Sequence, residues 1–349
     1  FSRTRCFPDM EISGRLVVGE QMEVVKGTVI IDEENGRIAE VREGGVESDD
    51  VVVPALVNAH THIGDSVAKE TGRGLPLDEV VAPPDSHKHR MLRSASRDEK
   101  RAAMRRTVER MRSEGVGVFG DFREGGVEGT EDLRAATEDS PVRAFALGSG
   151  PPEVLDIADG YGASGARDDE FWEEREAARE RGKTFGIHAG ERDPDDIDGA
   201  FEYEPDFLVH MVHARDEDLD RLAETETPVV ACPRCNLVIG VGKPPVEELV
   251  EATTVALGTD NVMLNVPSVW REMEFVSKHY DLPDDEVLRM ATVNGARALG
   301  VEGGVIGEGE PARLVVLRAD RSLADVHDVV AGVVRRAGAG DVKDVVLPQ

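Results

Sequence analysis

The sequence predicts an α/β protein in which a distorted (β/α)8 TIM-type barrel is joined to a small β-sandwich built from both ends of the chain. Short apolar runs alternate with charged, helix-forming stretches over about 250 residues, the usual size of an eightfold barrel. Both ends of the 349-residue chain instead contain short strands separated by turn residues. We therefore expect residues 1–50 and 305–349 to form the sandwich together and residues 51–304 to form the barrel.

The expected strands follow from apolar runs bounded by turn signals. In the sandwich they lie at residues 15–18, 24–31, 38–41, 312–317, 329–335 and 342–347. In the barrel they lie at residues 51–57, 116–122, 142–147, 184–188, 206–211, 228–231 and 254–258, with a weaker fourth run at 154–157. No crossover helix fits before this weak run, so either that repeat is degenerate or its strand lies elsewhere.

Helices are expected between the barrel strands, at residues 96–112, 168–181, 216–224, 246–251 and 284–299. The first is the best supported. Ser96 and Glu99 have the spacing of a capping box, and Met104, Val108 and Met111 share one helical face.

The composition argues against several classes of partner. Lys and Arg total 41 and Asp and Glu total 70, which gives a net charge of −29 that repels nucleic acids and anionic lipid surfaces. No apolar run approaches the roughly 18 residues of a membrane span, and three cysteines do not make a disulfide framework. We expect a cytoplasmic protein with a small-molecule substrate, and leave homo-oligomerisation open. Because only 8 of the basic residues are Lys, the surface is halophile-like, although an ordinary acidic protein is the alternative.

Metal-ligand residue types follow several barrel strands. His60 and His62 follow the first strand, and their spacing of two puts both rings on one side of an extended chain. His188, His210 and Asp260 come at the ends of the fifth, sixth and eighth strands. A lone histidine after a strand is usually an ordinary surface or core residue, but an ordered set at strand ends indicates a site. Histidines with a carboxylate suit zinc, with iron or manganese also open.

These residues resemble the amidohydrolase superfamily. The matching segments are Pro54-Ala55-Leu56-Val57-Asn58-Ala59-His60-Thr61-His62, His188-Ala189-Gly190-Glu191, Leu208-Val209-His210 and Gly258-Thr259-Asp260-Asn261. Residues 291–300 are similar to the family's end-of-barrel helix, and residues 311–316 to its return into a β-sandwich, although Ala312-Arg313 stands where the family usually has Ala-Asp. The pattern looks like the mononuclear branch of cytosine and adenosine deaminases and chlorohydrolases, because His188-Ala189-Gly190-Glu191 is similar to the adenosine deaminase segment and residues 232–242 are similar to the seventh-strand loop of the chlorohydrolase and cytosine-deaminase-like members. No Lys lies between Val142 and Asp168 to bridge two metals, which leaves Glu153 as the bridging candidate.

The resemblance implies one divalent metal ion held by His60, His62, His188 and Asp260. It also implies that Glu191 shuttles protons, that Asp260 takes a proton from the attacking water, and that His210 stabilises the developing oxyanion. The expected reaction is hydrolytic deamination of an amino-substituted heterocycle. The alternatives are ring opening of a cyclic amide such as an imidazolone, with the same residues, and a relative that has lost catalysis.

Four further residues are candidate substrate contacts. Lys88 and His89 lie in the insertion after the first barrel strand, and Arg123 follows the second; each could meet an anionic group, with an exposed polar loop as the alternative for the insertion. Asn261, from the matching segment Gly258-Thr259-Asp260-Asn261, is the fourth candidate.

Two other features are expected to be ordinary. His213 is predicted to be a solvated side chain, with a partner of the metal-site residues as the alternative. Cys232 and Cys235 have redox spacing but are predicted to lie in a loop without a redox role.

Overall fold

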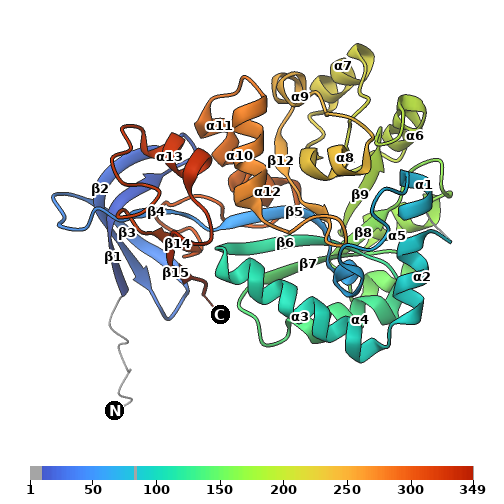
Figure 1. The fold of residues 1–349 in the computed structure, drawn as a ribbon, viewed down its shortest axis with the longest axis horizontal. Helices are drawn as coiled ribbons and strands as arrows, with labels where there is room; N and C mark the ends of the chain where they lie inside the picture. Colours follow the sequence, from blue (N-terminus) through green and yellow to red (C-terminus); the bar gives the residue numbers. More distant parts are fainter. Residues whose placement is uncertain (1–9, 82–84, 349) are drawn as a thin grey trace.

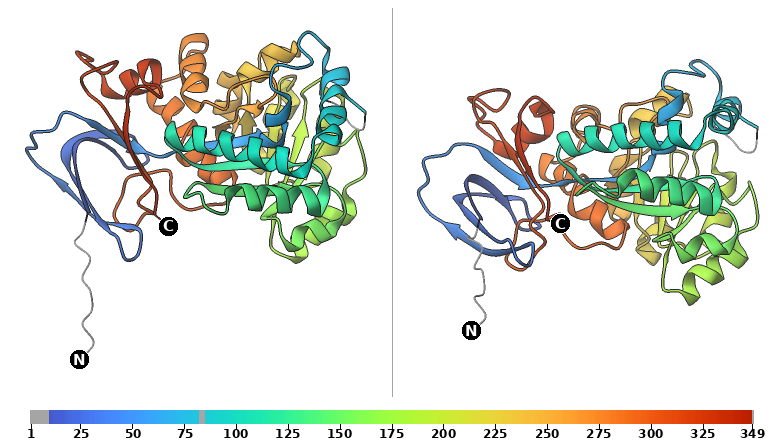
Figure 2. Two further views of the ribbon diagram at one scale, coloured as in Figure 1. Left: turned by 60° about the horizontal axis from the view of Figure 1, so that its bottom comes forward. Right: turned by 90° about the horizontal axis from the view of Figure 1, so that it is seen from below.

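The computed structural model describes residues 10–81 and 85–348, whose strands form two sheets (Figure 1). One sheet has six strands in the order β15-β14-β4-β1-β2-β3, and the other has nine in the order β12-β11-β10-β9-β8-β7-β6-β5-β13. The six-stranded sheet lies at one end of the molecule, next to the nine-stranded sheet and its helices, in all three views (Figures 1 and 2).

The six-stranded sheet combines the first and last parts of the chain. Its strands are β1 (Met10–Val18), β2 (Glu23–Asp32), β3 (Arg37–Glu43), β4 (Val51–Pro54), β14 (Leu314–Leu317) and β15 (Val342–Val346). β14 runs antiparallel to both β4 and β15, so Leu314 lies opposite Pro54 and Val346. The predicted two-sheet sandwich is not confirmed, because the strands in the described residues bond into one sheet at this end.

The nine-stranded sheet is parallel and curls until its edges meet. Its strands are β5 (Leu56–His62), β6 (Val116–Arg123), β7 (Arg143–Gly148), β8 (Gly160–Ala163), β9 (Thr184–Ala189), β10 (Phe207–His210), β11 (Val229–Ala231), β12 (Val255–Leu257) and β13 (Asp260–Asn261). β12 pairs with β11, whereas β13 pairs with β5 at the other edge. Gly258, between them, allows the close approach, since a Cβ there would lie 2.7 Å from the His60 Cβ.

Helices cover the outside of the curled sheet (Figure 1). The helices of the described residues are α1 (Leu77–Val80), α2 (His87–Ser94), α3 (Arg97–Ser113), α4 (Gly126–Thr137), α5 (Trp172–Glu180), α6 (Ile197–Glu202), α7 (Asp216–Thr225), α8 (Pro233–Ile239), α9 (Val246–Ala252), α10 (Val269–His279), α11 (Asp284–Met290), α12 (Val293–Ala298) and α13 (Val329–Arg336), with 3-10 helices η1 (Ile63–Ala68), η2 (Pro152–Asp156) and η3 (Pro194–Asp196). Helix α13 lies at the end of the molecule that holds the six-stranded sheet, packed against α10 and α11 (Figure 1). Among the described residues, no helix combines the length and apolar character needed to cross a bilayer.

Helix α3 confirms its sequence prediction. The Glu99 N–H donates to the Ser96 hydroxyl (3.3 Å), and the Ser96 N–H donates to the Glu99 carboxylate (2.8 Å), so the capping box is formed. Met104, Val108 and Met111 are all buried on the inner face.

The apolar run 51–57 is predicted as one strand but forms two. β4 pairs with β1 and β14, whereas β5 pairs with β6 and β13. The change occurs at Ala55, whose N–H donates to the Arg313 carbonyl, while the next N–H, of Leu56, donates to Gly115. The backbone thus passes from one sheet into the other without a loop.

The fourth barrel strand is β8, at residues 160–163, and the prediction at 154–157 is wrong. Residues 152–156 form η2, a short 3-10 helix with Pro152 in its first turn, and this replaces a longer crossover helix. β8 has few apolar side chains because its neighbours come close: a Cβ at Gly162 would lie 2.6 Å from the Phe122 ring.

Residues 329–335 are predicted as a strand, but they lie in helix α13. The Asp328 carboxylate caps this helix by accepting a hydrogen bond from the Ala331 N–H (3.0 Å). Val330, Val333 and Val334 are buried on one face, as the helical period requires.

The predicted helix 284–299 is divided into α11 and α12. Thr292 separates them, with φ −136° and ψ −97°, which is outside the helical region. Its hydroxyl donates to the Leu288 carbonyl (2.6 Å).

Candidate metal centre

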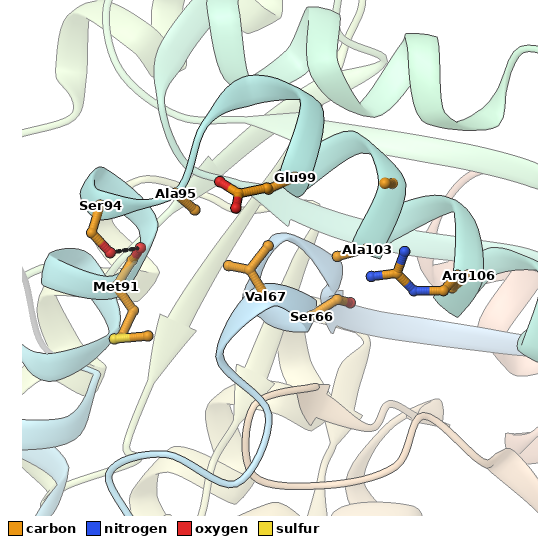
Figure 3. Close-up of a pocket in the computed structure, with 9 residues that line it drawn as sticks. Ser66, Val67, Met91, Ser94, Ala95, Glu99, Ala103 and Arg106 are labelled. Atoms are coloured by element: carbon orange, nitrogen blue, oxygen red, sulfur yellow. Dashed lines mark hydrogen bonds between the residues drawn. The ribbon is translucent and has the colours of Figure 1, made fainter.

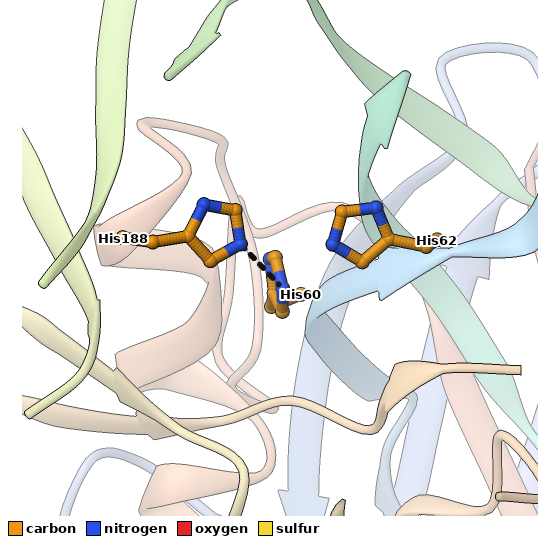
Figure 4. A group of neighbouring side chains, drawn as sticks. All are labelled: His60, His62 and His188. Atoms are coloured by element: carbon orange, nitrogen blue, oxygen red, sulfur yellow. Dashed lines mark hydrogen bonds between the residues drawn. The ribbon is translucent and has the colours of Figure 1, made fainter. Parts of the chain in front are cut away.

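Five predicted site residues meet where the parallel strands end. His60 and His62 lie on β5, His188 on β9, His210 on β10 and Asp260 on β13. His60 Nε2 is 3.3 Å from both His188 Nε2 and Asp260 Oδ1, and His62 Nε2 is 3.5 Å from Asp260 Oδ1. Figure 4 shows the His60 ring between those of His62 and His188. The barrel therefore brings together side chains that are far apart in the sequence.

Two overlapping groups in this cluster have ligand atoms close enough to share an ion. In His60, His62 and His188, and again in His60, His210 and Asp260, the atoms lie within 4.8 Å of one another. His60 is fully buried, and His210 and Asp260 are 1% exposed. The donors are thus concentrated in a nearly dry environment, where a cation would be bound strongly.

Hydrogen bonds determine which ring nitrogen faces the cluster. His188 Nδ1 lies 2.8 Å from the Ala163 carbonyl, and His62 Nδ1 lies 2.9 Å from Glu124 Oε1. Because these oxygens accept, both Nδ1 atoms carry the hydrogen, which leaves the Nε2 lone pairs toward the cluster. In contrast, Asn236 Nδ2 lies 3.1 Å from His210 Nδ1. With the amide donating, His210 Nε2 carries the hydrogen and is a donor.

Burial favours the neutral form of His62, His188 and His210. It lowers the pKa of His62 to about 4 and that of His210 to about 3, and it holds the pKa of His188 well below its usual value. Neutral rings retain the lone pair that a metal ion needs.

The two carboxyl groups beside these rings are shifted in opposite directions. Burial raises the pKa of Glu191 well above its ordinary value, with the charge of Asp260 adding to the effect. Burial also opposes ionisation of Asp260, but the hydrogen bond with His60 and the neighbouring histidines hold its pKa well below the usual range. Burial therefore favours the protonated form of Glu191, whereas the histidines favour the ionised form of Asp260; Glu191 Oε2 lies 3.7 Å from His210 Nε2.

The donor set fits a divalent cation. Within the described part of the chain, Asp260 Oδ2 is buried and has no hydrogen-bond partner. An unpaired carboxylate oxygen among neutral imidazoles is costly unless a cation balances it. Three imidazole nitrogens and one carboxylate oxygen match the ligands that zinc prefers.

The backbone is strained at two of these strand ends. His210 and Met211 have φ of 79° and 50°, and Asp260 has φ of 57°, which is the left-handed region that residues other than glycine seldom occupy. Such strain persists where the surrounding structure holds it, as is common at functional sites.

Lys88 and Arg123, predicted as substrate contacts, are in buried ion pairs. Lys88 Nζ contacts Glu124 and lies 3.4 Å from Asp65 Oδ2. Arg123 contacts the other oxygen of Glu124, and its Nη1 lies 3.1 Å from Asp121 Oδ2. Both cationic side chains are only 4% exposed. Protein carboxylates already neutralise them, so their role toward a substrate stays a prediction.

The other two candidate contacts lie near these pairs. His89 is on helix α2, so the exposed-loop alternative for this segment is wrong; its Nδ1 is 2.8 Å from the Ser86 hydroxyl. Asn261 is 4% exposed and donates to Asp260 Oδ1 (2.9 Å), so it supports a proposed ligand directly.

His213 and the cysteine pair differ from their predictions. His213 is half-buried, and its Nε2 has no hydrogen-bond partner among residues 10–81 and 85–348. Cys232 and Cys235 are free, buried thiols at the first turn of helix α8, where a loop is predicted. Burial raises the pKa of both thiols well above the usual value, so they are protonated and unreactive.

Sequence reasoning missed Glu124 and Asn236, which bond to clustered histidines. Glu124 follows β6 directly, so the rule that strand ends carry functional residues could have found it together with Arg123. Asn236 lies inside helix α8, and no sequence pattern indicates that it faces His210.

A cavity of about 460 Å³ lies beside helix α3 (Figure 3). It is lined by η1, α2 and α3, with Val67, Met91 and Ala103 among its walls. Its lining includes no residue of the predicted site.

Comparison with known proteins gives consistent matches over the whole chain. A model of the Amidohydrolase family matches residues 51–159 and 154–347. A protein of Methanocaldococcus jannaschii is 37% identical, over 96% of this chain and 97% of its own. The 5-methylthioadenosine/S-adenosylhomocysteine deaminase of Haloarcula marismortui is 27% identical, over 97% of this chain and 91% of its own. The crystal structure of atrazine chlorohydrolase from Arthrobacter aurescens, complexed with zinc, has the same fold, with a TM-score of 0.81 at 19% identity and coverage of 97% and 94%.

Proposed function

Because this chain belongs to the amidohydrolase family, we propose that it is a zinc-dependent hydrolase that deaminates an amino-substituted heterocycle. The observation that carries the proposal is the buried cluster of His60, His62, His188, His210 and Asp260, with Glu191 Oε2 3.7 Å from His210 Nε2. The relative from Haloarcula marismortui, named as a deaminase, supports the reaction type.

In this proposal, His60, His62, His188 and Asp260 hold the ion. The zinc complexed in the Arthrobacter aurescens structure supports the choice of metal. A bound zinc ion supplies Lewis acidity, which makes water a nucleophile near neutral pH.

The remaining groups move protons and stabilise charge. Glu191, whose raised pKa favours the protonated form, donates its proton to a ring nitrogen of the heterocycle, takes the remaining proton of the attacking oxygen as the carbonyl forms, and gives that proton to the departing amine. The proton that Asp260 accepts from the water then returns to Glu191 and restores both groups. Asp260 accepts the proton from the attacking water. His210, with Nε2 as a donor, stabilises the negative charge that develops on oxygen. The products are ammonia and a ring carbonyl.

Ring opening of a cyclic amide would use the same groups, but the named relative favours deamination. A non-catalytic relative is disfavoured, because the proposed ligands and both proton-transfer groups are present and clustered.

The test is to purify the protein, measure zinc per chain and assay ammonia release. Suitable substrates are 5-methylthioadenosine, S-adenosylhomocysteine, a free aminopurine and an aminotriazine, with an imidazolone as the cyclic amide. We expect about one zinc per chain and ammonia release that a chelator abolishes and zinc restores. His188→Asn should lose both zinc and activity, whereas His279→Asn, at an exposed histidine on α10, should retain both. Absence of zinc, or a new carboxylate without ammonia, would contradict the proposal.

A further inference from the structure

Helix α2 is tied to the metal centre by a buried ionic network that the proposed reaction does not use. Glu124, directly after β6, is at its centre. One carboxylate oxygen of Glu124 contacts both His62 Nδ1 (2.9 Å) and Lys88 Nζ, and the other contacts Arg123 Nη2. Lys88, which comes from α2, is 3% exposed. Helix α2 therefore places the buried ammonium group of Lys88 against Glu124, the hydrogen-bond partner of the proposed ligand His62.

Lys88 also reaches the other side of the centre. Its Nζ donates to Asn261 Oδ1 at 3.4 Å, and Asn261 Nδ2 donates to Asp260 Oδ1 at 2.9 Å. Lys88 is thus linked through Glu124 to His62 and through Asn261 to Asp260. It contacts neither ligand directly, so any effect on the ion must pass through these two side chains.

The remaining members of the network keep Glu124 in place. Arg123 Nη1 lies 3.1 Å from Asp121 Oδ2, and Asp121 Oδ1 accepts from the Ile63 N–H at 2.6 Å. Asp121 and Asp65 are fully buried, and Asp65 has Lys88 as an ion-pair partner at 3.4 Å. The free-energy cost of removing these charges from water is offset by their attraction to one another. This attraction includes Lys88 only while α2 is docked, that is, packed so that Lys88 contacts Glu124 and Asp65.

We propose that Lys88 is a positioning residue that couples the docking of helix α2 to metal binding. A docked Lys88 holds Glu124 against His62 Nδ1 and Asn261 against Asp260, so two ligands are oriented before the ion arrives. Partners of this kind alter metal affinity by about 10–100-fold. Binding linkage is reciprocal, so the ion stabilises the docked helix by the same factor. The inference rests on the proposed metal centre but not on the identity of the substrate.

The first measurement is zinc affinity by competition with a chromophoric chelator. Lys88→Met should weaken zinc binding by about 10–100-fold. Lys88→Arg, which keeps the charge, should recover part of the loss. The matched control is Arg90→Met, which removes an exposed cation from the same helix and should leave the affinity unchanged.

A second variant separates this effect from simple misfolding. Lys88→Met leaves the Asp65 carboxylate buried beside an apolar side chain, so Lys88→Met/Asp65→Asn removes both charges of that pair. We expect the double variant to fold and still to bind zinc about 10–100-fold more weakly, since Glu124 has lost its contact with Lys88. Recovery of wild-type affinity in the double variant would overturn the inference.

The second measurement is hydrogen exchange in α2 with and without zinc. In the wild type, zinc should slow exchange of the α2 amides by the factor found for affinity, and in the double variant zinc should have no such effect. Unchanged zinc affinity without Lys88, or zinc-independent exchange in wild-type α2, would overturn the inference. A wild type that binds zinc but releases no ammonia would contradict only the proposed reaction, whereas a wild type that binds no zinc would overturn both.

Discussion

Three of the clustered histidines differ in the group that is hydrogen-bonded to their Nδ1 atom. A carbonyl oxygen holds His188 and a carboxylate holds His62, so both present lone pairs, whereas the Asn236 amide leaves His210 as a donor. Three chemically identical rings are thereby given two roles. This division agrees with the roles that the resemblance implies, but it follows here from hydrogen bonding alone.

At this scale, the sequence predicts well which side chains gather at the strand ends, and it predicts poorly the residues that support them. His60 and His62 are recognisable because period two and a strand end both apply to them. The neutralisation of Lys88 by Glu124 and Asp65 depends on contacts between β6, η1 and α2, which no local pattern records. A buried, paired cation and an exposed, free one look the same in a sequence.

Replacing Glu191 tests the proposed proton donor. Glu191→Gln keeps the shape but cannot transfer a proton, so kcat for ammonia release should fall by about 10²–10⁴-fold. Zinc content should stay at the wild-type value, since Glu191 is not a proposed ligand. Glu202→Gln, at an exposed site on α6, is the matched control. A Glu191→Gln variant with wild-type kcat would show that this assignment is wrong.

At the scale of elements, local composition predicts most barrel strands. It gives the wrong secondary structure where tertiary packing determines the conformation. β8 has glycine at residues 160 and 162 because neighbouring chain and the Phe122 ring occupy the space of side chains. Helix α13 contains four valines, which favour a strand, yet its Asp328 cap and one buried face produce a helix. Both errors arise because tertiary contacts override local preference.

The buried ion pair between helices α8 and α10 should make the free energy of unfolding depend on pH. Glu272 on α10 is fully buried and lies 3.1 Å from Arg234 on α8. Burial raises the pKa of Glu272 from 4.5 to about 7, with Arg234 opposing the shift. Between these values the folded state holds a proton that the unfolded state has released, so stability falls as pH rises through this window.

Glu272→Gln removes this titration while keeping a hydrogen-bonding side chain of similar size. As the pH rises from about 5 to 8, the free energy of unfolding of wild type should fall by roughly 1–3 kcal/mol relative to that of the Glu272→Gln variant. Urea unfolding at several pH values measures the difference. Glu274→Gln, at an exposed site on the same helix, should follow the wild-type curve. Parallel curves for Glu272→Gln and wild type would mean that Glu272 is not protonated in the folded protein.

At the scale of the molecule, a buried ionic network lies within a chain that has a net charge of −29. The centre uses a few histidines and carboxylates, and its two nearby cations, Lys88 and Arg123, already have protein partners. We therefore expect most of the net charge of −29 to lie on the surface, where like charges repel one another. It bears on stability and solubility more than on the reaction.

Salt should accordingly stabilise the folded protein. Raising KCl from about 0.1 to 2 M shortens the screening length from about 10 Å to below 3 Å, which weakens repulsion between exposed carboxylates. We expect Tm to rise, with most of the gain complete by about 1 M KCl. Because exposed ion pairs contribute little and the excess of acidic groups is large, the weakening of surface ion pairs does not reverse this effect.

A charge-reversed variant separates screening from other effects of salt. Glu173→Lys/Glu224→Lys changes two exposed residues and shifts the net charge from −29 to −29 + 4 = −25. Its Tm in low salt should exceed that of wild type, and its gain on adding KCl should be smaller, because less repulsion remains to be screened. Sucrose, which stabilises by exclusion from the surface without screening, should raise Tm equally in both proteins. A wild-type Tm that stays constant or falls with KCl would show that surface repulsion does not limit the stability of this fold.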